Sequence, residues 1–437
     1  MRFRLLCFPL LALLASGCER MPEDPVFIYG RLLNADGSPR ANTPLRVERS
    51  SKSPSYTGYP VGGEVVDLGY RPYSEGTSEA AGYFTLETLA GDITTENAYV
   101  YEQYRFRVFP PLEADGHGVF AAFSFRDDVE LPLLRTWDSG FTVSDGAQGP
   151  TLTFAAAPPV PETPPSGEVP TIWDGNTSEP RPAPPTTPEP VLHLHGPDGL
   201  LWEQFRATSP WVVSPYVLED FTGPEAQLRA VSTGLWFFYP LGADGSDLDF
   251  RVEWRTPRKP LPPGALRPVS RGAACGPVHT PGPCPYTDGK LAIQNTVPPS
   301  TQPGASPVGL ESLTFTLDRA VLPRRVVVRG LKPLFTPRQQ ARVILEGSEN
   351  GDTYEPLADV PVVLPNPYDP WGHYVGLTAG TEADSPFDPP LDPYRTTLFL
   401  DAPLTASKPV RFVRLRVMQD GNSPLWMEKL AEVSVFE

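Results

Sequence analysis

The sequence predicts an all-β protein made of tandem β-sandwich domains. The chain has 437 residues, of which 57 are prolines and 37 are glycines, and prolines at this frequency interrupt long helices. Valine, threonine, tyrosine and phenylalanine instead recur in short alternating runs, such as residues 410–417, which are typical of strands. The length allows about three domains that each bury a hydrophobic core.

The beginning of the chain has the pattern of a secretory signal. Arg2 and Arg4 give it a basic start, and residues 5–14 are almost entirely apolar. An apolar run of about ten residues is too short to cross a bilayer as a helix, but it suits a signal peptide. The small residues 15–17 then lead directly into Cys18.

This stretch resembles the lipobox of bacterial lipoproteins. The resemblance implies that residues 1–17 are removed and that Cys18 carries lipid, which anchors the protein to a membrane through residues 18–25 as a polar tether. Buried acyl chains contribute about 0.8 kcal/mol per methylene, so three of them hold effectively permanently. Glu19, where some lipoproteins have aspartate, implies the outer membrane, at its periplasmic face or at the cell surface. The alternative is an ordinary signal peptide with an incidental cysteine.

The charge of the chain excludes some partners. The formal net charge is −16, and it becomes −18 once Arg2 and Arg4 leave with the signal peptide. Such a surface repels nucleic acid and anionic lipid headgroups. We therefore expect no nucleic-acid partner, and a membrane link through the lipid anchor alone.

The cysteines fit an exported protein. Cys7 leaves with the signal peptide and Cys18 is used for lipid, which leaves Cys275 and Cys284 across a Gly/Pro-rich loop. In an oxidising compartment this pair predicts a disulfide. A metal site that includes His279 is the alternative, but it lacks a fourth ligand nearby.

Residues 26–155 contain a series of short strands and turns. In order, they are Gly30-Arg31-Leu32, an Asp36-Gly37-Ser38-Pro39 turn, residues 44–47 and Gly82-Tyr83-Phe84. The order resembles the carboxypeptidase regulatory-like, or prealbumin-like, family. The resemblance implies a small sandwich that positions other modules and performs no chemistry.

The middle of the chain carries fewer landmarks. Residues 156–190 are Pro-rich and predict an extended linker. Alternation returns over residues 191–264, which vaguely resemble a fibronectin type III module followed by a second linker. His193 and His195 lie on the same side of a strand there. With no third ligand apparent, we expect them to face solvent and to bind no metal.

Residues 265–437 carry four landmarks in order, at residues 286–289, 348–354, 411–415 and 432–436. They resemble the discoidin, or F5/8 type C, family, which shares its jelly roll with family 32 carbohydrate-binding modules. The predicted fold is therefore a series of β-sandwiches that ends in a discoidin-like jelly roll. The resemblance implies ligand binding through loops at one end of that domain.

The same resemblance implies a structural Ca²⁺ ion. Its carboxylate ligands would be Asp288 and Glu432, completed by backbone carbonyls near Tyr286 and Leu291, since calcium prefers oxygen ligands. Lys290 departs from the family pattern, and its amine could neutralise the pocket without a metal. No other cofactor is expected.

Candidate ligand-binding aromatic residues lie in the long segment 365–394. Trp371, Tyr374 and Tyr368 could stack on a sugar or contact a protein. The alternative is that this Pro-rich segment folds its own aromatic side chains against the sandwich.

The sequence contains no Gly-x-Ser-x-Gly elbow, His-Glu-x-x-His motif, phosphate loop or dinucleotide fingerprint. We therefore expect a non-enzymatic, lipid-anchored envelope protein that binds a polysaccharide through its C-terminal domain. A scaffolding lipoprotein that binds an envelope protein is the alternative, and an enzyme is a third hypothesis.

Overall fold

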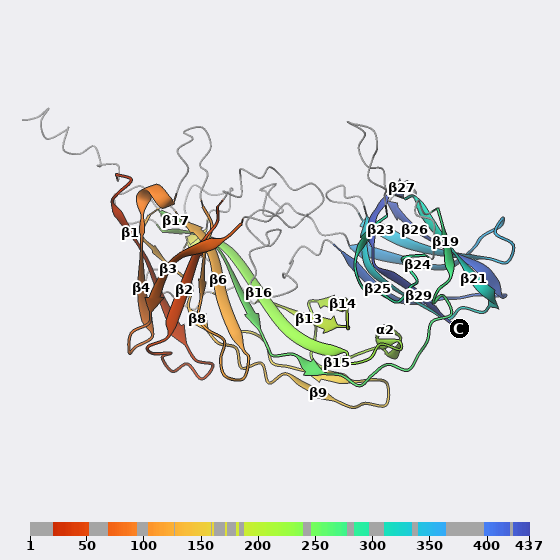
Figure 1. Ribbon diagram of the computed structural model, residues 1–437, viewed down its shortest axis with the longest axis horizontal. Coiled ribbons are helices and arrows are strands. Elements are labelled where there is room, and N and C mark those ends of the chain that lie inside the picture. The colour runs from red at the N-terminus through yellow and green to blue at the C-terminus, as the bar shows by residue number, and fades with distance from the viewer. Residues whose placement is uncertain are drawn as a thin grey trace, which may run out of the picture.

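The computed structural model has an all-β architecture of successive β-sandwiches (Figure 1). It describes residues 21–51, 69–93, 104–125, 127–158, 160, 171–172, 181–182, 188–238, 246–277, 284–296, 310–333, 340–363, 397–419 and 423–437. Within these residues the helices are single turns, the 3-10 turn η2 (Ala90–Asp92) and the α-helix α2 (Pro215–Leu218).

A small sheet forms one layer of the N-terminal body. Its strands are β1 (Pro25–Leu33), β4 (Tyr83–Leu89), β7 (Val129–Glu130) and β8 (Leu134–Arg135), with β1 between the others. Gly30 on β1 lies opposite Phe84 on β4. A side chain at position 30 would collide with the Phe84 ring, so the glycine makes room for this core residue. Gly37 has a φ of 85°, the positive value that an Asp-Gly turn requires.

The facing layer is a long sheet, ordered β12–β11–β16–β17–β6–β5–β2–β3 in the described part of the chain, with β13 and β18 also beside β16 and β14 beside β13. Its strands are β2 (Pro44–Arg49), β3 (Arg71–Thr77), β5 (Phe106–Phe109), β6 (Gly118–Phe125), β11 (Thr171–Ile172), β12 (Arg181–Pro182), β13 (Glu189–His195), β14 (Leu200–Phe205), β16 (Glu225–Phe238), β17 (Ser246–Arg255) and β18 (Lys259–Pro260). Alternate residues such as Val47, Phe123 and Trp254 face the small sheet and form one core.

A short sheet extends this body toward the C-terminal half. It consists of β9 (Thr142–Ser144), β10 (Thr151–Thr153) and β15 (Trp211–Val212). Phe141, Leu152 and Val213 from this region are buried in the same core as the long sheet. The N-terminal body therefore has one continuous core in its described residues.

The long sheet crosses the domain boundaries that we expect from the sequence. β6 pairs with β17 from Gly118 opposite Arg255 to Phe125 opposite Leu248. Strands from the expected modules 26–155 and 191–264 thus share one sheet, and residues 191–264 do not form a sheet of their own. β6 is buried along its whole length and lies between β5 and β17 in this sheet.

The C-terminal body is a second sandwich. One described layer holds β19 (Ala274–Gly276), β21 (Ser312–Val321), β23 (Gln340–Ser348), β24 (Glu355–Val363), β26 (Val410–Gln419) and β27 (Pro424–Leu425). The other holds β20 (Gln294–Asn295), β22 (Arg325–Pro333), β25 (Leu398–Pro403), β28 (Met427–Leu430) and β29 (Glu432–Phe436). A separate aliphatic core that includes Phe315, Val328 and Leu415 fills the space between the layers.

The two bodies pack against each other through aromatic contacts. The Trp202 ring meets Phe399 edge-on with centroids 5.8 Å apart, and Tyr216 on α2 meets Phe436 at 5.1 Å. Val327 of β22 also belongs to the N-terminal core. β22 is buried on both faces for this reason, one face against its own sandwich and the other against the N-terminal body.

Candidate functional site

The sequence-predicted ligand residues lie outside the described residues. These are Trp371, Tyr374 and Tyr368 in the segment 365–394 and Cys18 at the expected anchor. The roles assigned to them remain predictions.

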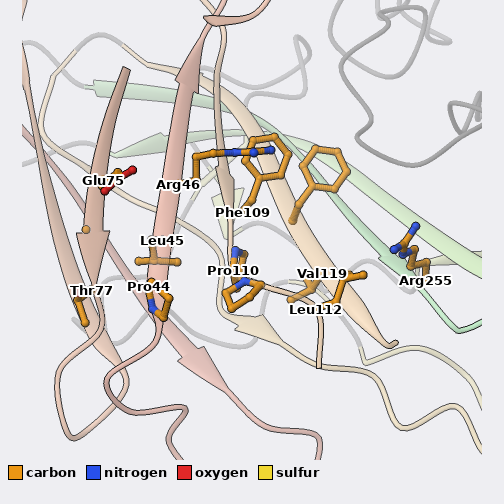
Figure 2. A pocket seen from close by; sticks show the side chains of 13 residues that line it. Pro44, Leu45, Arg46, Glu75, Thr77, Phe109, Pro110, Leu112, Val119 and Arg255 are labelled. Atoms are coloured by element: carbon orange, nitrogen blue, oxygen red, sulfur yellow. The ribbon is translucent and has the colours of Figure 1, made fainter. Parts of the chain in front are cut away.

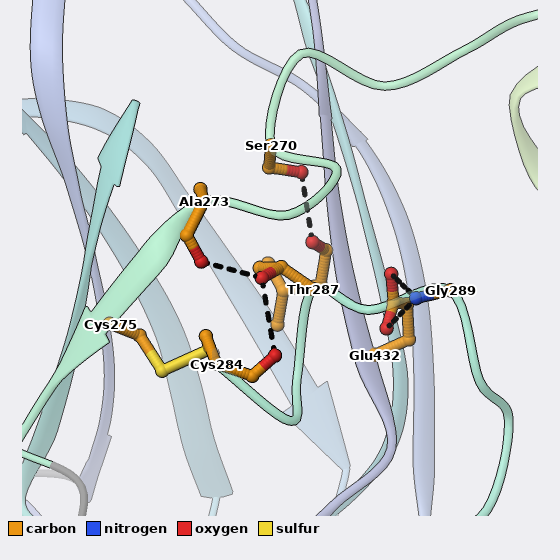
Figure 3. Close-up of a disulfide and its surroundings, with 8 residues drawn as sticks. Ser270, Ala273, Cys275, Cys284, Thr287, Gly289 and Glu432 are labelled. Atoms are coloured by element: carbon orange, nitrogen blue, oxygen red, sulfur yellow. Dashed lines mark hydrogen bonds between the residues drawn. A yellow bond between two sulfur atoms is a disulfide. The ribbon is translucent and has the colours of Figure 1, made fainter. Parts of the chain in front are cut away.

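The predicted disulfide is present. Cys275 on β19 is bonded to Cys284, which is buried, in the loop that returns toward β20 (Figure 3). The Thr287 hydroxyl donates to the carbonyl of Ala273 at 2.8 Å, and the Ser270 hydroxyl donates to the carbonyl of Val433 at 3.0 Å. These bonds hold the disulfide loop against the closing strand β29.

The predicted calcium ligands Asp288 and Glu432 both accept hydrogen bonds from backbone N–H groups. The backbone N–H of Gly289 donates to both carboxylate oxygens of Glu432, at 3.2 Å each, so a donor occupies a place where a cation would need an oxygen ligand (Figure 3). Asp288 accepts from the backbone N–H of Lys290 at 3.0 Å, and the Lys290 amine lies 3.7 Å from its other oxygen. The Lys290 amine and the Asp288 carboxylate therefore form an ion pair on the surface.

A guanidinium group stands near Glu432 where the resemblance implied a metal. The Nε atom of Arg271 lies 3.9 Å from a carboxylate oxygen of Glu432. Gly289 has a φ of 84°, and a side chain there would collide with the Arg271 guanidinium. Across the described ranges, no three His, Cys, Asp or Glu side chains are grouped to hold a metal ion. These residues therefore do not fit a bound Ca²⁺.

Arg271 belongs to a buried charge cluster between the two bodies. It donates to Glu219 at 2.6 Å, and Arg329 of β22 donates to the other carboxylate oxygen of Glu219. Both Glu219 and Glu432 are fully buried. Burial, followed by the charge of Glu219, raises the pKa of Glu432 to about 8 against the opposing effect of Arg329 and Arg271.

His193 and His195 are not solvent-facing, so that expectation is wrong. Both share one face of β13 as expected, but both are buried. Arg229 donates to Nδ1 of His193 at 3.3 Å, and a Glu203 oxygen lies 3.2 Å from its Nε2. Burial, and then the nearby arginines, lower the pKa of His193 well below its usual range and that of His195 to about 3. Neutral imidazoles thus form part of an internal polar network.

The outer face of the long sheet carries an open groove of about 640 Å³ across β3, β2, β5, β6 and β17 (Figure 2). Its floor is apolar and includes Phe109, Phe120 and Leu112. The rings of Phe109 and Phe120 are stacked, with centroids 5.8 Å apart and an interplanar angle of 14°. Polar side chains from β2, β3 and β17 surround this floor, which is the combination that small-ligand sites use.

Arg46 is the most exposed cation of the groove, with 59% of its side chain accessible. Its Nε lies 3.2 Å from one oxygen of Glu48, and its guanidinium lies over the Phe109 ring at 4.9 Å. Arg107 binds the other oxygen of Glu48 through two donors, at 2.8 and 2.7 Å. Arg46 is therefore held in a fixed orientation although it faces solvent.

No sequence motif indicates this groove. Arg46 and Glu48 alternate with the core residues of β2, and Phe109 alternates with those of β5. A phenylalanine at an outward position beside such charges was the available signal. The family that residues 26–155 resemble implies a sandwich without chemistry, and so it does not predict a binding site in this part of the chain.

No family model and no curated protein matches this chain. Among solved structures, it is similar to the C-terminal domain of a chitobiase from Bacteroides fragilis, at 14% identity over 35% of this chain and 77% of that one, with a TM-score of 0.22. It is also similar to chitosan-binding module 1 of a chitosanase/glucanase from Paenibacillus sp. IK-5, at 9% identity over 39% of this chain and 99% of that one, again with a TM-score of 0.22. Similarity at this level identifies no family and assigns no ligand.

In the described part of the chain, no helix combines the length and apolarity needed to cross a bilayer.

Proposed function

We propose that this protein is a lipid-anchored lipoprotein of the bacterial outer membrane that binds a glycan without modifying it. The observation that carries the glycan proposal is the open groove with its apolar lining and polar rim. Sugars present apolar C–H faces and ring hydroxyls together, so a site for them needs both kinds of surface. An open groove suits a segment of a polymer better than a small, fully enclosed molecule.

The anchoring proposal rests on the sequence around Cys18, and the disulfide is consistent with it. A Cys275–Cys284 bond fits a protein that folds in an oxidising compartment. We further propose that the C-terminal sandwich, which resembles discoidin domains in its sequence landmarks, contributes a second binding surface through Trp371. The inferred role is presentation of binding surfaces from the membrane.

Two experiments test the proposal. Metabolic labelling with an alkyne-tagged fatty acid should mark the wild-type protein and should not mark Cys18→Ser, which should also leave the membrane fraction. A glycan array probed with the mature Cys18→Ser protein should give binding to a defined polysaccharide class. Trp371→Ala should weaken that binding if the C-terminal surface takes part. Co-purification of one envelope protein with no glycan bound would instead establish the scaffolding alternative.

A further inference from the structure

We propose that the groove on the N-terminal body is a binding site for a carboxylated glycan, with Arg46 and Arg255 as its anion-recognising residues. This inference rests on the proposed glycan-binding function and specifies its ligand class. It assigns a binding role to the part of the chain whose sequence resemblance implied only a spacer.

Arg46 is exposed although it contacts both Glu48 and Phe109. Its Nε lies 3.2 Å from Glu48 and its guanidinium lies over the Phe109 ring, while 59% of the side chain remains exposed. A guanidinium can bind a carboxylate through two parallel donors. Because Glu48 and Phe109 already fix the side chain, a ligand would lose little affinity in ordering it.

Arg255 lies across the groove from Arg46. Arg46 is on β2 and Arg255 is on β17, and β5 and β6 lie between them. Neighbouring strands are about 4.8 Å apart, so the two strands that carry the arginines are separated by about 14 Å. Figure 2 shows Phe109 and Val119 between the two side chains. A glycan spanning this floor could meet a cation at each end.

Gly118 on β6 leaves space for the apolar floor of the groove, because it has no side chain. A Cβ atom at this position would lie 2.6 Å from Leu112 and 3.7 Å from the stem of Arg255. Without a side chain there, Leu112 lies over β6 with 46% of its surface exposed, and Arg255 extends alongside it. The exposed Leu112 side chain provides an apolar surface for the C–H face of a sugar ring.

The lining of the groove holds two arginines, Arg46 and Arg255, against one carboxylate, Glu75, and this balance favours an acidic over a neutral glycan. The guanidinium of Arg255 loses solvation in the groove and is repelled by Arg258, and both effects lower its pKa. A carboxylate bound beside it would favour the charged form of this guanidinium. The whole chain carries a net charge of −16, so an acidic polymer is repelled at long range. Binding must therefore come from local contacts with the arginines.

The test uses the mature protein with Cys18→Ser and isothermal titration calorimetry. The probes are oligomers of galacturonate, mannuronate and glucuronate, each compared with its carboxyl methyl ester. We expect one uronate to bind and its ester to bind at least tenfold more weakly, since hydrogen bonds to charged groups contribute about 1.5–3 kcal/mol. Arg46→Gln and Arg255→Gln should each weaken uronate binding about tenfold.

Arg319→Gln is the matched control. Arg319 is 65% exposed and pairs with Glu437 in the C-terminal body, so this substitution removes the same charge far along the chain from the groove. It should leave uronate binding unchanged, and unchanged thermal midpoints should show that all three variants fold. Equal binding of the acid and ester forms would refute the acidic class.

The proposal and the broader function can fail separately. Uronate binding that survives Arg46→Gln and Arg255→Gln but is lost in Trp371→Ala would place the ligand outside the groove, and this inference would be wrong while glycan binding stands. Absence of binding to every acidic and neutral glycan of an array would refute both.

Discussion

Replacing Arg329 with methionine should uncouple the two bodies of the protein. Arg329 is fully buried on β22, and its guanidinium donates to the N-terminal body at the carbonyls of Leu201 (3.1 Å) and Val217 (2.9 Å) and at the carboxylate of Glu219. Within its own sandwich it donates to the Ser434 hydroxyl at 3.1 Å. Methionine fills similar space but offers none of these donors.

The expected loss of stability comes from the buried acceptors that the substitution leaves without a donor. Removing one partner of a buried ion pair costs about 3–5 kcal/mol, and each buried acceptor left unpaired adds about 1–3 kcal/mol. Arg271 still pairs with Glu219 at 2.6 Å, which reduces the penalty at that carboxylate. We therefore expect Arg329→Met to lower the free energy of unfolding by about 3–5 kcal/mol.

Differential scanning calorimetry is the assay, because it shows both the size of the loss and its cooperativity. The wild-type bodies should unfold together, whereas Arg329→Met should separate two transitions. Arg342→Met is the control, since Arg342 is 42% exposed and pairs with Asp359 inside one sandwich, and it should cost no more than about 1 kcal/mol.

The double variant Glu219→Gln/Arg329→Met should cost less than the sum of the single variants, with a coupling of about 0.5–3 kcal/mol. A single transition in Arg329→Met, with a loss no larger than in the control, would refute the reasoning.

Three further predictions concern stability. The raised pKa of Glu432, about 8, means that the folded state keeps a proton that the unfolded state releases above its ordinary pKa of 4.5. The free energy of unfolding from urea titrations should therefore fall as pH rises from about 5 to 8, by up to about 1.4 kcal/mol per pH unit. In Glu432→Gln this slope should be absent, and an unchanged slope would contradict the assignment. The nine-residue separation of Cys275 and Cys284 predicts that replacing both with alanine costs about 2–3 kcal/mol, and urea unfolding of that variant should no longer respond to reductant. Gly30→Ala should destabilise the small sheet by about 1–3 kcal/mol through its collision with Phe84, and a thermal midpoint equal to wild type would show that this ring moves freely.

The sequence predicts local structure well where alternation and turn chemistry agree. Residues 410–417 alternate, and they lie in β26 (Val410–Gln419). The Asn350-Gly351 pair predicts a turn, and Gly351 has a φ of 87°. The disulfide follows from the cysteine count and from the export that the first residues of the chain predict. Each of these predictions depends on residues close together in the chain.

What the sequence could not predict depends on residues brought together over long separations. Arg329 and Glu219 are 110 positions apart, and nothing near either residue indicates the other. The residues next to His193 in the sequence do not indicate its burial, because its partners Glu203 and Arg229 come from neighbouring strands. The run of three valines before Arg329 was a signal of a strand buried on both faces, and β22 has that character.

The pairing of β6 with β17 has a consequence for how this protein can be made and divided. Residues 118–125 pair with residues more than a hundred positions later in the chain. This long sequence separation raises the contact order and slows folding. Any fragment that stops before residue 246 leaves Gly118–Phe125, a strand of apolar and small residues, as an open edge. Such fragments should aggregate, and truncation at the Pro-rich segment is not a route to an isolated N-terminal domain.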